Sequence, residues 1–299
     1  MTPATDTGSV RRLLRDPIGS TDEVIVVSDH VTVLREAVLV VAEADEDAPD
    51  HVRLLGTEGA LSRACDDFLA ASRAADLVEE ERLSMRVSEQ GHLPSLVITG
   101  GEGGDPNRQS AAGEVEDPSR HSDSGEVTTI SPLPGNDAVA VRTDEADPVA
   151  TIRSAFARSF SDAAEYEVGV PGYTRLLESL DVAVGPAVRE DVASVMEAGV
   201  TVRSSADGVD EIDTILLVGG RNGAQLFELS EWAEDLGVAS RATMSSRKRQ
   251  LEAAGLLTTE KIRADVGRPR QRLLVAPEEL RDSPPADLIR GARDALVDE

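Results

Sequence analysis

The chain has few of the residues that build disulfides and metal sites. Its 299 residues include a single cysteine, Cys65, and four histidines, His30, His51, His92 and His121, which lie far apart. One thiol cannot form an internal disulfide or a thiolate cluster, and the histidines lack the spacing of zinc ligands. We therefore expect a reducing compartment, no metal site and no cofactor.

Long apolar runs are also absent. No stretch approaches the roughly 18 to 20 apolar residues that cross a bilayer, and residues 1–16 contain no apolar core of a secretion signal. We expect a cytoplasmic protein with no membrane partner. Aromatic residues make up only 2% of the chain, but 40% of its residues are hydrophobic, which is too many for a wholly disordered acidic protein. The length fits about two folded domains.

Lysine is nearly missing. Lys248 and Lys261 are the only lysines among 30 basic residues, and 56 acidic residues give a formal net charge of −26. Such an acidic surface stays hydrated but repels itself unless salt is high, so we interpret the chain as halophilic. An acidic protein from a GC-rich mesophilic genome is the alternative, because such genomes also favour arginine over lysine.

One segment has the opposite charge. Residues 237–275 hold nine basic and only three acidic side chains, and both lysines are among them. A basic segment in an otherwise acidic chain indicates a polyanionic partner. A solvated basic face on a helical bundle is the simpler alternative.

The first half has an α/β pattern. Short β-branched runs bounded by turn residues predict strands at Val24–Val27, Val52–Leu55, Leu83–Val87, Leu96–Ile98, Val127–Ile130 and Ala138–Val141. Helical spacing lies between them at Val31–Val41, Gly59–Leu77 and Pro148–Tyr166. The polar, Gly-rich segment Thr99–Glu126 has hardly any apolar anchor, so we expect a disordered loop there. Residues 1–166 are therefore predicted to form an α/β regulatory or oligomerisation domain.

Two further features concern packing. The helix predicted at Gly59–Leu77 places Cys65 on its apolar stripe, which favours a core position over a reactive thiol. Gly172–Ala198 reads as two helices broken at Gly185-Pro186. We predict that residues 167–208, ending in the linker Ser204–Gly208, form a helical hairpin that connects the domains or makes a homodimer.

Residues 209–299 have the element order of a winged helix-turn-helix domain followed by a C-terminal helix. A first helix is predicted from Asp210 to about Arg221, and Leu226–Leu229 is predicted to be extended. Ser230 can then cap a second helix that ends at Gly237, and Ser240 can cap a third that ends at Gly255. Two short helices joined by a turn with glycine are typical of helix-turn-helix proteins.

The third helix gives candidate DNA contacts. With Met244 and Leu251 toward the core, Ala242, Ser246 and Arg249 point outward. Arginine can bind guanine, glutamine adenine, and a methyl group the thymine methyl. The predicted base-facing residues are Ala242, Thr243, Ser245, Ser246, Arg249 and Gln250, and the predicted phosphate contacts are Arg241, Arg247 and Lys248. Ser240, the predicted cap of this helix, is also a predicted DNA contact.

The segment after the third helix can fold back as a β-hairpin wing. Its polar tip, residues 265–270, holds the turn residues that a hairpin needs. An arginine between glycine and proline suits a narrow minor groove, and arginines beside it suit the backbone. The wing candidates are Lys261, Arg263, Gly267, Arg268, Pro269, Arg270 and Arg272.

These motifs resemble those of a known family. Ser230–Leu274 is similar to winged helix-turn-helix regulators, in which the wing often reads Gly-Arg-Pro-Arg, as it does at Gly267–Arg270. DDFLAASRAADLVE at Asp66–Glu79, LSEWAEDLGVASRATMS and DVGRPR resemble the haloarchaeal TbsP-type transcriptional regulators over nearly the whole chain. The long polar loop is the main departure. The resemblance implies a regulator of sugar-metabolism genes.

Two enzyme-like patterns are weaker. The element order of residues 20–166 is similar to the phospholipase-D-like effector domains of some archaeal sugar regulators, but their His-x-Lys motif is impossible because no lysine precedes Lys248. Gly219–Gly223 lacks the spacing of a dinucleotide-binding loop and is expected to end a helix. We therefore expect a catalytically empty domain in a protein that is not an enzyme.

Two functions remain open at this stage. The first is a transcriptional regulator that binds double-stranded promoter DNA as a homodimer, with a small-molecule effector left unidentified. The second is a metabolite-binding or partner-binding protein whose basic C-terminal domain contacts RNA or an acidic protein.

Overall fold

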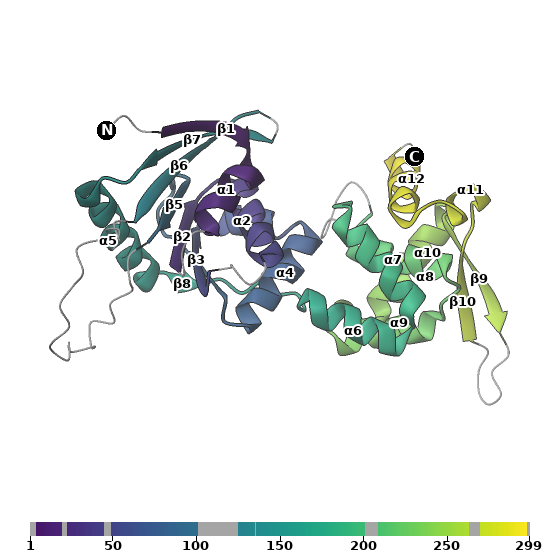
Figure 1. Ribbon diagram of the computed structural model, residues 1–299. Coiled ribbons are helices and arrows are strands. Elements are labelled where there is room, and N and C mark those ends of the chain that lie inside the picture. The colour runs from purple at the N-terminus through teal and green to yellow at the C-terminus, as the bar shows by residue number, and fades with distance from the viewer. Residues whose placement is uncertain are drawn as a thin grey trace. The chain divides into compact units, whose positions relative to one another are not determined.

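The computed structural model describes residues 4–19, 23–44, 49–100, 125–134, 136–200, 209–262 and 270–297 (Figure 1). These residues form two compact units. The first comprises residues 1–64 and 77–167, and the second comprises residues 65–76 and 168–299. The predicted linker Ser204–Gly208 lies outside the described residues.

The first unit is built on one mixed sheet with the strand order β1-β7-β6-β5-β2-β3-β4-β8. The strands β2, β3 and β4 run parallel to one another, and every other neighbouring pair is antiparallel. All six predicted strands are confirmed, whereas β1 and β8 were not predicted. The strands are β1 (Ala4–Ser9), β2 (Glu23–Ser28), β3 (His51–Gly56), β4 (Leu83–Val87), β5 (Leu96–Thr99), β6 (Glu126–Pro132), β7 (Asp137–Thr143) and β8 (Ala164–Glu165).

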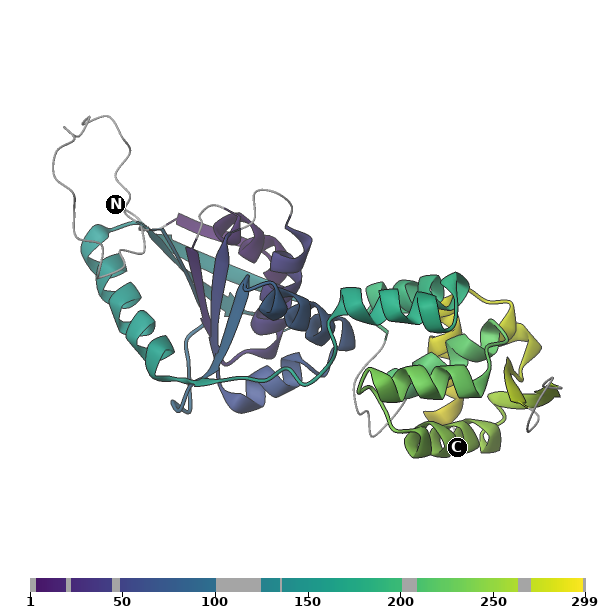
Figure 2. The same cartoon turned by 90° about the horizontal axis from the view of Figure 1, so that it is seen from below.

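Helices cover both faces of this sheet (Figure 2). On one face lie α1 (Val10–Ile18) and α2 (Val31–Glu43), and on the other lies α5 (Ala146–Asp162). Val149 and Phe160 of α5 are buried in a cluster with sheet residues such as Ile98. The helix predicted at 148–166 ends early, because the backbone N–H of Tyr166 donates to the carbonyl of Met85 at 2.9 Å and draws β8 to the sheet edge.

The helix predicted at 59–77 is two helices, α3 (Glu58–Ala64) and α4 (Phe68–Glu79). The break has a local cause: the Asp67 carboxylate accepts a hydrogen bond from the backbone N–H of Ala70 at 3.1 Å and starts a new helix. Cys65 lies at the break and is buried, as expected for a core residue.

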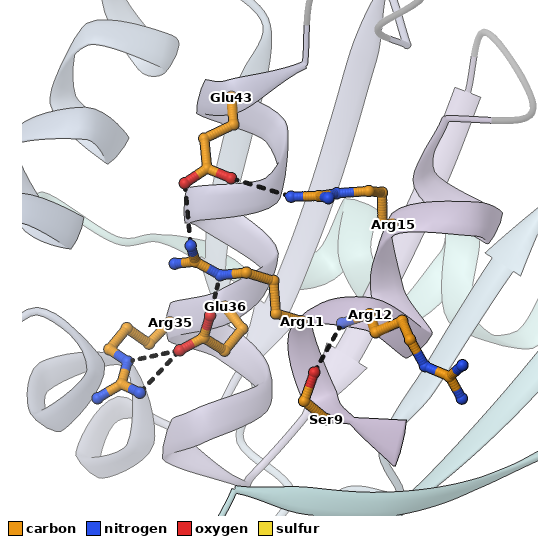
Figure 3. A network of polar contacts seen from close by, with 7 residues as sticks. All are labelled: Ser9, Arg11, Arg12, Arg15, Arg35, Glu36 and Glu43. Carbon is orange, nitrogen blue, oxygen red and sulfur yellow. Dashed lines mark hydrogen bonds and ion pairs between the residues drawn. The ribbon is translucent and has the colours of Figure 1, made fainter. Parts of the chain in front are cut away.

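The helix α1 was not predicted, and ion pairs tie it to α2 (Figure 3). Glu36 of α2 is only 4% exposed and accepts hydrogen bonds from Arg11 at 2.6 Å and Arg35 at 2.7 Å. The exposed Glu43 accepts from Arg11 and from Arg15. The apolar residues of α1 face the core at helical spacing, a pattern that sequence reasoning could have detected: Val10, Leu13, Leu14, Pro17 and Ile18.

The loop predicted at 99–126 is shorter than its predicted range. Thr99 and Glu126 are paired residues of β5 and β6, so each belongs to the sheet. Residues 101–124 lie outside the described residues.

The second unit has one core shared by all its main elements. The hairpin α6–α7 breaks at Gly185, where φ is +124°, and Pro186 opens α7. Its Leu176 and Val192 are buried in the same cluster as Leu216 of α8, so the hairpin is part of this core and does not stand apart as a connector. The elements are α6 (Tyr173–Ala183), α7 (Pro186–Glu197), α8 (Glu211–Arg221), α9 (Leu226–Asp235), α10 (Arg241–Ala253), β9 (Leu257–Ile262), β10 (Arg270–Val275), α11 (Glu278–Arg281) and α12 (Pro285–Val297).

Two adjacent glycines allow close packing on α8, Gly219 against Leu229 of α9 and Gly220 against β9 and β10. Gly219 and Gly220, expected in a helix-ending loop, lie inside α8, which ends at Arg221. A Cβ atom on Gly220 would lie 2.6 Å from the Leu257 side chain and 3.3 Å from the backbone of Leu274. Packing therefore requires glycine at position 220, because a larger side chain would collide with the wing strands.

Candidate DNA-binding surface

The second helix of the predicted helix-turn-helix begins earlier than expected. Leu226–Leu229, predicted to be extended, forms the first turn of α9, and Ser230, predicted as its cap, is buried inside the helix. The Ser230 hydroxyl has no hydrogen-bond partner within the described residues. Leu229 and Ala233 continue the apolar stripe of α9, so burial of this stripe outweighs the capping preference of serine.

The turn and the third helix agree with the prediction. Gly237 adopts a left-handed φ of +77° after α9, the conformation that glycine takes most easily. The Ser240 hydroxyl caps α10 by accepting from the backbone N–H of Thr243 at 3.0 Å. The helix-turn-helix is thus α9, residues 236–240 and α10.

The predicted inner and outer faces of α10 are confirmed. Met244 and Leu251 are buried in the core. The side chains on the other face are available to a partner: Ala242, Thr243, Ser246, Arg249 and Gln250 are exposed, and Ser245 is half-buried. Arg249 is held over its own helix, with Nε donating to the Ser245 carbonyl at 3.2 Å.

Lys248 was predicted to lie at an open flank of α10 and to contact a phosphate, but it does not lie there. Lys248 is only 8% exposed, and its Nζ donates to Glu252 at 3.0 Å. Glu252 also accepts a hydrogen bond from Thr259 of β9. Lys248 therefore lies at the edge of the core, one helical turn after Met244, and Glu252 partly neutralises its charge.

Arg247 is likewise engaged within the protein. Its Nη2 donates to Asp210 and to Asp213, each at 2.5 Å. These carboxylates form the capping box of α8, in which Asp210 accepts from the backbone N–H of Asp213 at 2.9 Å. Arg247 thus fixes α10 against the start of α8.

Burial perturbs this acid pair. Asp213 is 3% exposed, and burial together with the neighbouring carboxylate of Asp210 raises the pKa of Asp213 to about 7, although the charge of Arg247 opposes the shift. Burial opposes the charge of Arg247, but the same two carboxylates outweigh this effect and raise the pKa of Arg247. The cluster has more acid than base, so it has no spare positive charge for a phosphate.

The wing is an antiparallel hairpin of β9 and β10. Lys261, Arg270 and Arg272 are exposed on it. The backbone N–H of Leu273 in β10 donates to the carbonyl of Ala224, which lies just before α9, at 2.9 Å. The wing-tip candidates lie outside the described residues: Arg263, Gly267, Arg268 and Pro269.

Phe227 is a surface residue that sequence reasoning missed. It lies in the first turn of α9 and is 45% exposed. The guanidinium carbon of Arg241 lies 5.8 Å from its ring centroid, and that of Arg270 lies 5.3 Å away, both within cation–π range. Phe227 thus brings together one arginine of α10 and one of the wing. The sequence signal that could have identified Phe227 is an aromatic residue close to the basic segment, in a chain with few aromatic residues.

No helix in the described ranges is long and apolar enough to cross a membrane. Histidine, cysteine and carboxylate side chains form no group of three that could hold a metal ion in this part of the chain.

Comparison with known proteins matches two sequence families. Residues 3–102 match the family described as transcriptional regulator TbsP-like, N-terminal, and residues 172–293 match transcriptional regulator TbsP-like, C-terminal HTH domain. No curated protein matches the chain. The matches cover part of the first unit and most of the second.

Two solved structures show weak similarity. TrmBL2, an archaeal chromatin protein whose structure shows a novel mode of DNA binding, is 14% identical with a TM-score of 0.30 over 55% of each chain. The phospholipase D family member Nuc from Salmonella typhimurium is 13% identical with a TM-score of 0.34, over 55% of this chain and 99% of that chain. The chain therefore spans about half of the length of TrmBL2.

Proposed function

This chain belongs to the TbsP-like transcriptional regulators, and from that premise we propose that it binds specific promoter sequences in double-stranded DNA. The exposed face of α10 supports the proposal most directly. It presents Arg249 and Gln250, whose side chains can form two hydrogen bonds with guanine and adenine, while Met244 holds the opposite face in the core.

The wing and the start of α10 would hold the backbone of the same duplex. Arg270 and Arg272 are exposed on β10, and Arg241 is exposed at the start of α10. Phosphate contacts of this kind set the register of a protein on DNA but do not read its sequence. We assign base reading to α10 and positioning to these three arginines.

We further propose that the first unit is a sensor or oligomerisation domain without phospholipase-D-type catalysis. That chemistry uses a His-x-Lys motif, and no lysine precedes Lys248. We expect the regulator to act as a homodimer in the cytoplasm, where promoter DNA lies. Light scattering of the purified full chain, with and without DNA, measures its oligomeric state.

Two finer features belong to the same proposal. The net charge of −26 and the near absence of lysine support a halophilic archaeal host. The resemblance of the motifs implies sugar-metabolism genes as targets. Transcript profiling of a deletion strain grown with and without sugar tests this choice of genes, and a target set without such genes contradicts it.

The experiment for DNA binding is chromatin immunoprecipitation from the native host, followed by titration of a labelled duplex taken from the recovered sites. We expect tighter binding to this duplex than to a shuffled duplex, and a loss of this preference in Arg249→Ala. Arg158→Ala is a matched control, because Arg158 is an exposed arginine on α5 of the other unit. Equal binding to both duplexes, or preferred binding to RNA or an acidic protein, contradicts the proposal.

A further inference from the structure

Most arginines of the candidate DNA surface already have acidic partners inside the protein. In the described part of residues 237–275, only Arg249 and Lys261 have no acidic side chain within 4.0 Å. The others are paired within the protein: Arg241, Arg247, Lys248, Arg270 and Arg272. The basic charge that suggests DNA binding is therefore largely neutralised before DNA arrives.

Arg241 has the most complete pairing of the exposed arginines. Its Nε donates to Glu234 at 2.6 Å, and its Nη2 donates to Glu231 at 3.4 Å. Both glutamates are on α9, one turn apart, and all three side chains are nearly half exposed. The pairing is thus on the surface, where a DNA phosphate can compete for the same guanidinium.

The wing arginine is held in a similar way. Arg270 lies 3.7 Å from Glu228 and donates to Gln225 at 3.1 Å. Glu228 is on α9, as are the two partners of Arg241. Phe227 stacks with both arginines. One helix therefore supplies the carboxylates and the aromatic ring that hold the two arginines in place.

From this arrangement we propose that Glu231 and Glu234 are built-in counter-ions of Arg241, and that DNA binding makes these carboxylates take up solvent cations. The inference rests on the proposed function. A phosphate can displace the glutamates, which then need new counter-ions. Alternatively, it can bind the remaining guanidinium N–H groups beside the glutamates, and a cation must then separate the two anions. Both routes consume cations.

Cation uptake opposes the usual salt effect on DNA binding. Neutralising phosphates releases cations from DNA, so affinity normally falls steeply as salt rises. Uptake by the carboxylates cancels part of this release, and the logarithm of affinity then falls less steeply with the logarithm of salt concentration. A protein that works at high salt would retain DNA binding in this way.

The test compares charge-neutral variants with a matched control on the same helix. The double variant Glu231→Gln with Glu234→Gln removes the counter-ions of Arg241. Asp235→Asn, which changes the charge by as much as Glu231→Gln or Glu234→Gln alone, is the control. Asp235 is an exposed acid next to Glu234 and has no basic partner within 4.0 Å in the described residues. Affinity for a fixed duplex is measured by fluorescence anisotropy at several KCl concentrations, with circular dichroism to verify folding.

We expect the double variant to bind more tightly at low salt and to have a steeper salt slope, by roughly one unit per removed carboxylate, the size of one phosphate contact. Asp235→Asn should leave the slope unchanged. Equal slopes in wild type and the double variant, or the same change in Asp235→Asn, overturn the counter-ion inference but leave DNA binding intact. A wild-type protein that binds no duplex at any salt concentration overturns the proposed function and this inference with it.

Discussion

Arg247 of α10 donates a hydrogen bond to Asp213 of α8 at 2.5 Å, and this contact joins α10 to the first turn of α8. From sequence, Arg247 was expected at a flank of α10, on a phosphate. The structure gives it a different role, because Asp210 completes a pair of buried carboxylates that need a cation. Arg247 is a positioning residue for α10.

We expect Arg247→Ala to lower the free energy of unfolding of the second unit by about 2 to 4 kcal/mol, because it leaves two buried carboxylates without their cation. Denaturant unfolding at high salt, followed by the fluorescence of Trp232, measures the loss. Arg249→Ala, on the exposed face of the same helix, is the control and should change stability by less than about 0.5 kcal/mol. Equal losses in both variants would contradict a special role for Arg247.

The raised pKa of Asp213 predicts a specific pH dependence. Its ordinary value is 3.8 and its value in the folded unit is about 7, so between these limits the folded state binds a proton that the unfolded state has lost. The contribution of this group to stability is then greatest at low pH and falls as pH rises through about 7. Relative to Asp213→Asn, wild type should therefore be most stable near pH 4, lose stability as pH rises to about 7, and change little from there to pH 8.5. Parallel curves for the two proteins would show that Asp213 titrates normally.

Residues with strong local signals were predicted correctly. Ser240 caps α10, Gly237 ends α9 in a left-handed conformation, and Met244 faces the core, as expected from capping, glycine and helical periodicity. The six central strands were also correct, because their β-branched runs are short and bounded by turn residues.

The errors arose where tertiary contacts decide the outcome. Ser230 has the chemistry of a helix cap, but burial of Leu229 and Ala233 extends α9 past it. Lys248 carries a charge that suggested exposure, but its position one turn after Met244 places it at the core edge beside Glu252. The chemistry of a single residue does not predict which residues distant in the sequence will pack against it.

Phe227 provides a test of the surface that sequence reasoning missed. Phe227→Ala should weaken binding to specific and shuffled duplexes alike, by about two- to fivefold for each of its two arginine contacts, because each cation–π contact contributes about 0.5 to 1 kcal/mol at an exposed site. The melting temperature should change little, since the ring is 45% exposed. Val182→Ala is the matched control, as Val182 is an exposed apolar residue on α6. A large loss of stability in Phe227→Ala would indicate a packing role instead.

The ion pairs of α1 and α2 predict unequal effects of two similar substitutions (Figure 3). Glu36→Gln should destabilise the first unit by about 1 to 3 kcal/mol, because Glu36 is buried and holds Arg11 and Arg35. Glu43→Gln should cost less than about 1 kcal/mol, because its side chain is 48% exposed. Thermal unfolding of the two variants in the same buffer gives the comparison. The prediction fails if Glu43→Gln costs as much as Glu36→Gln.

The last prediction separates base reading from backbone binding on the proposed DNA surface. Arg249 is exposed on α10 and has no acidic partner within 4.0 Å in the described residues, whereas Arg270 lies on the wing beside Phe227. Arg249→Ala should therefore cost about 1 to 3 kcal/mol on the specific duplex and relax the preference at one base position.

Arg270→Ala should weaken binding to specific and shuffled duplexes by the same factor, because a phosphate contact is the same at every sequence. Affinities for a panel of duplexes with single base changes, measured at one fixed salt concentration, distinguish the two patterns. If Arg249→Ala weakens all duplexes equally, α10 binds the backbone at this position. If Arg270→Ala changes the order of preference, the wing reads sequence, and the division of roles between α10 and β10 is wrong.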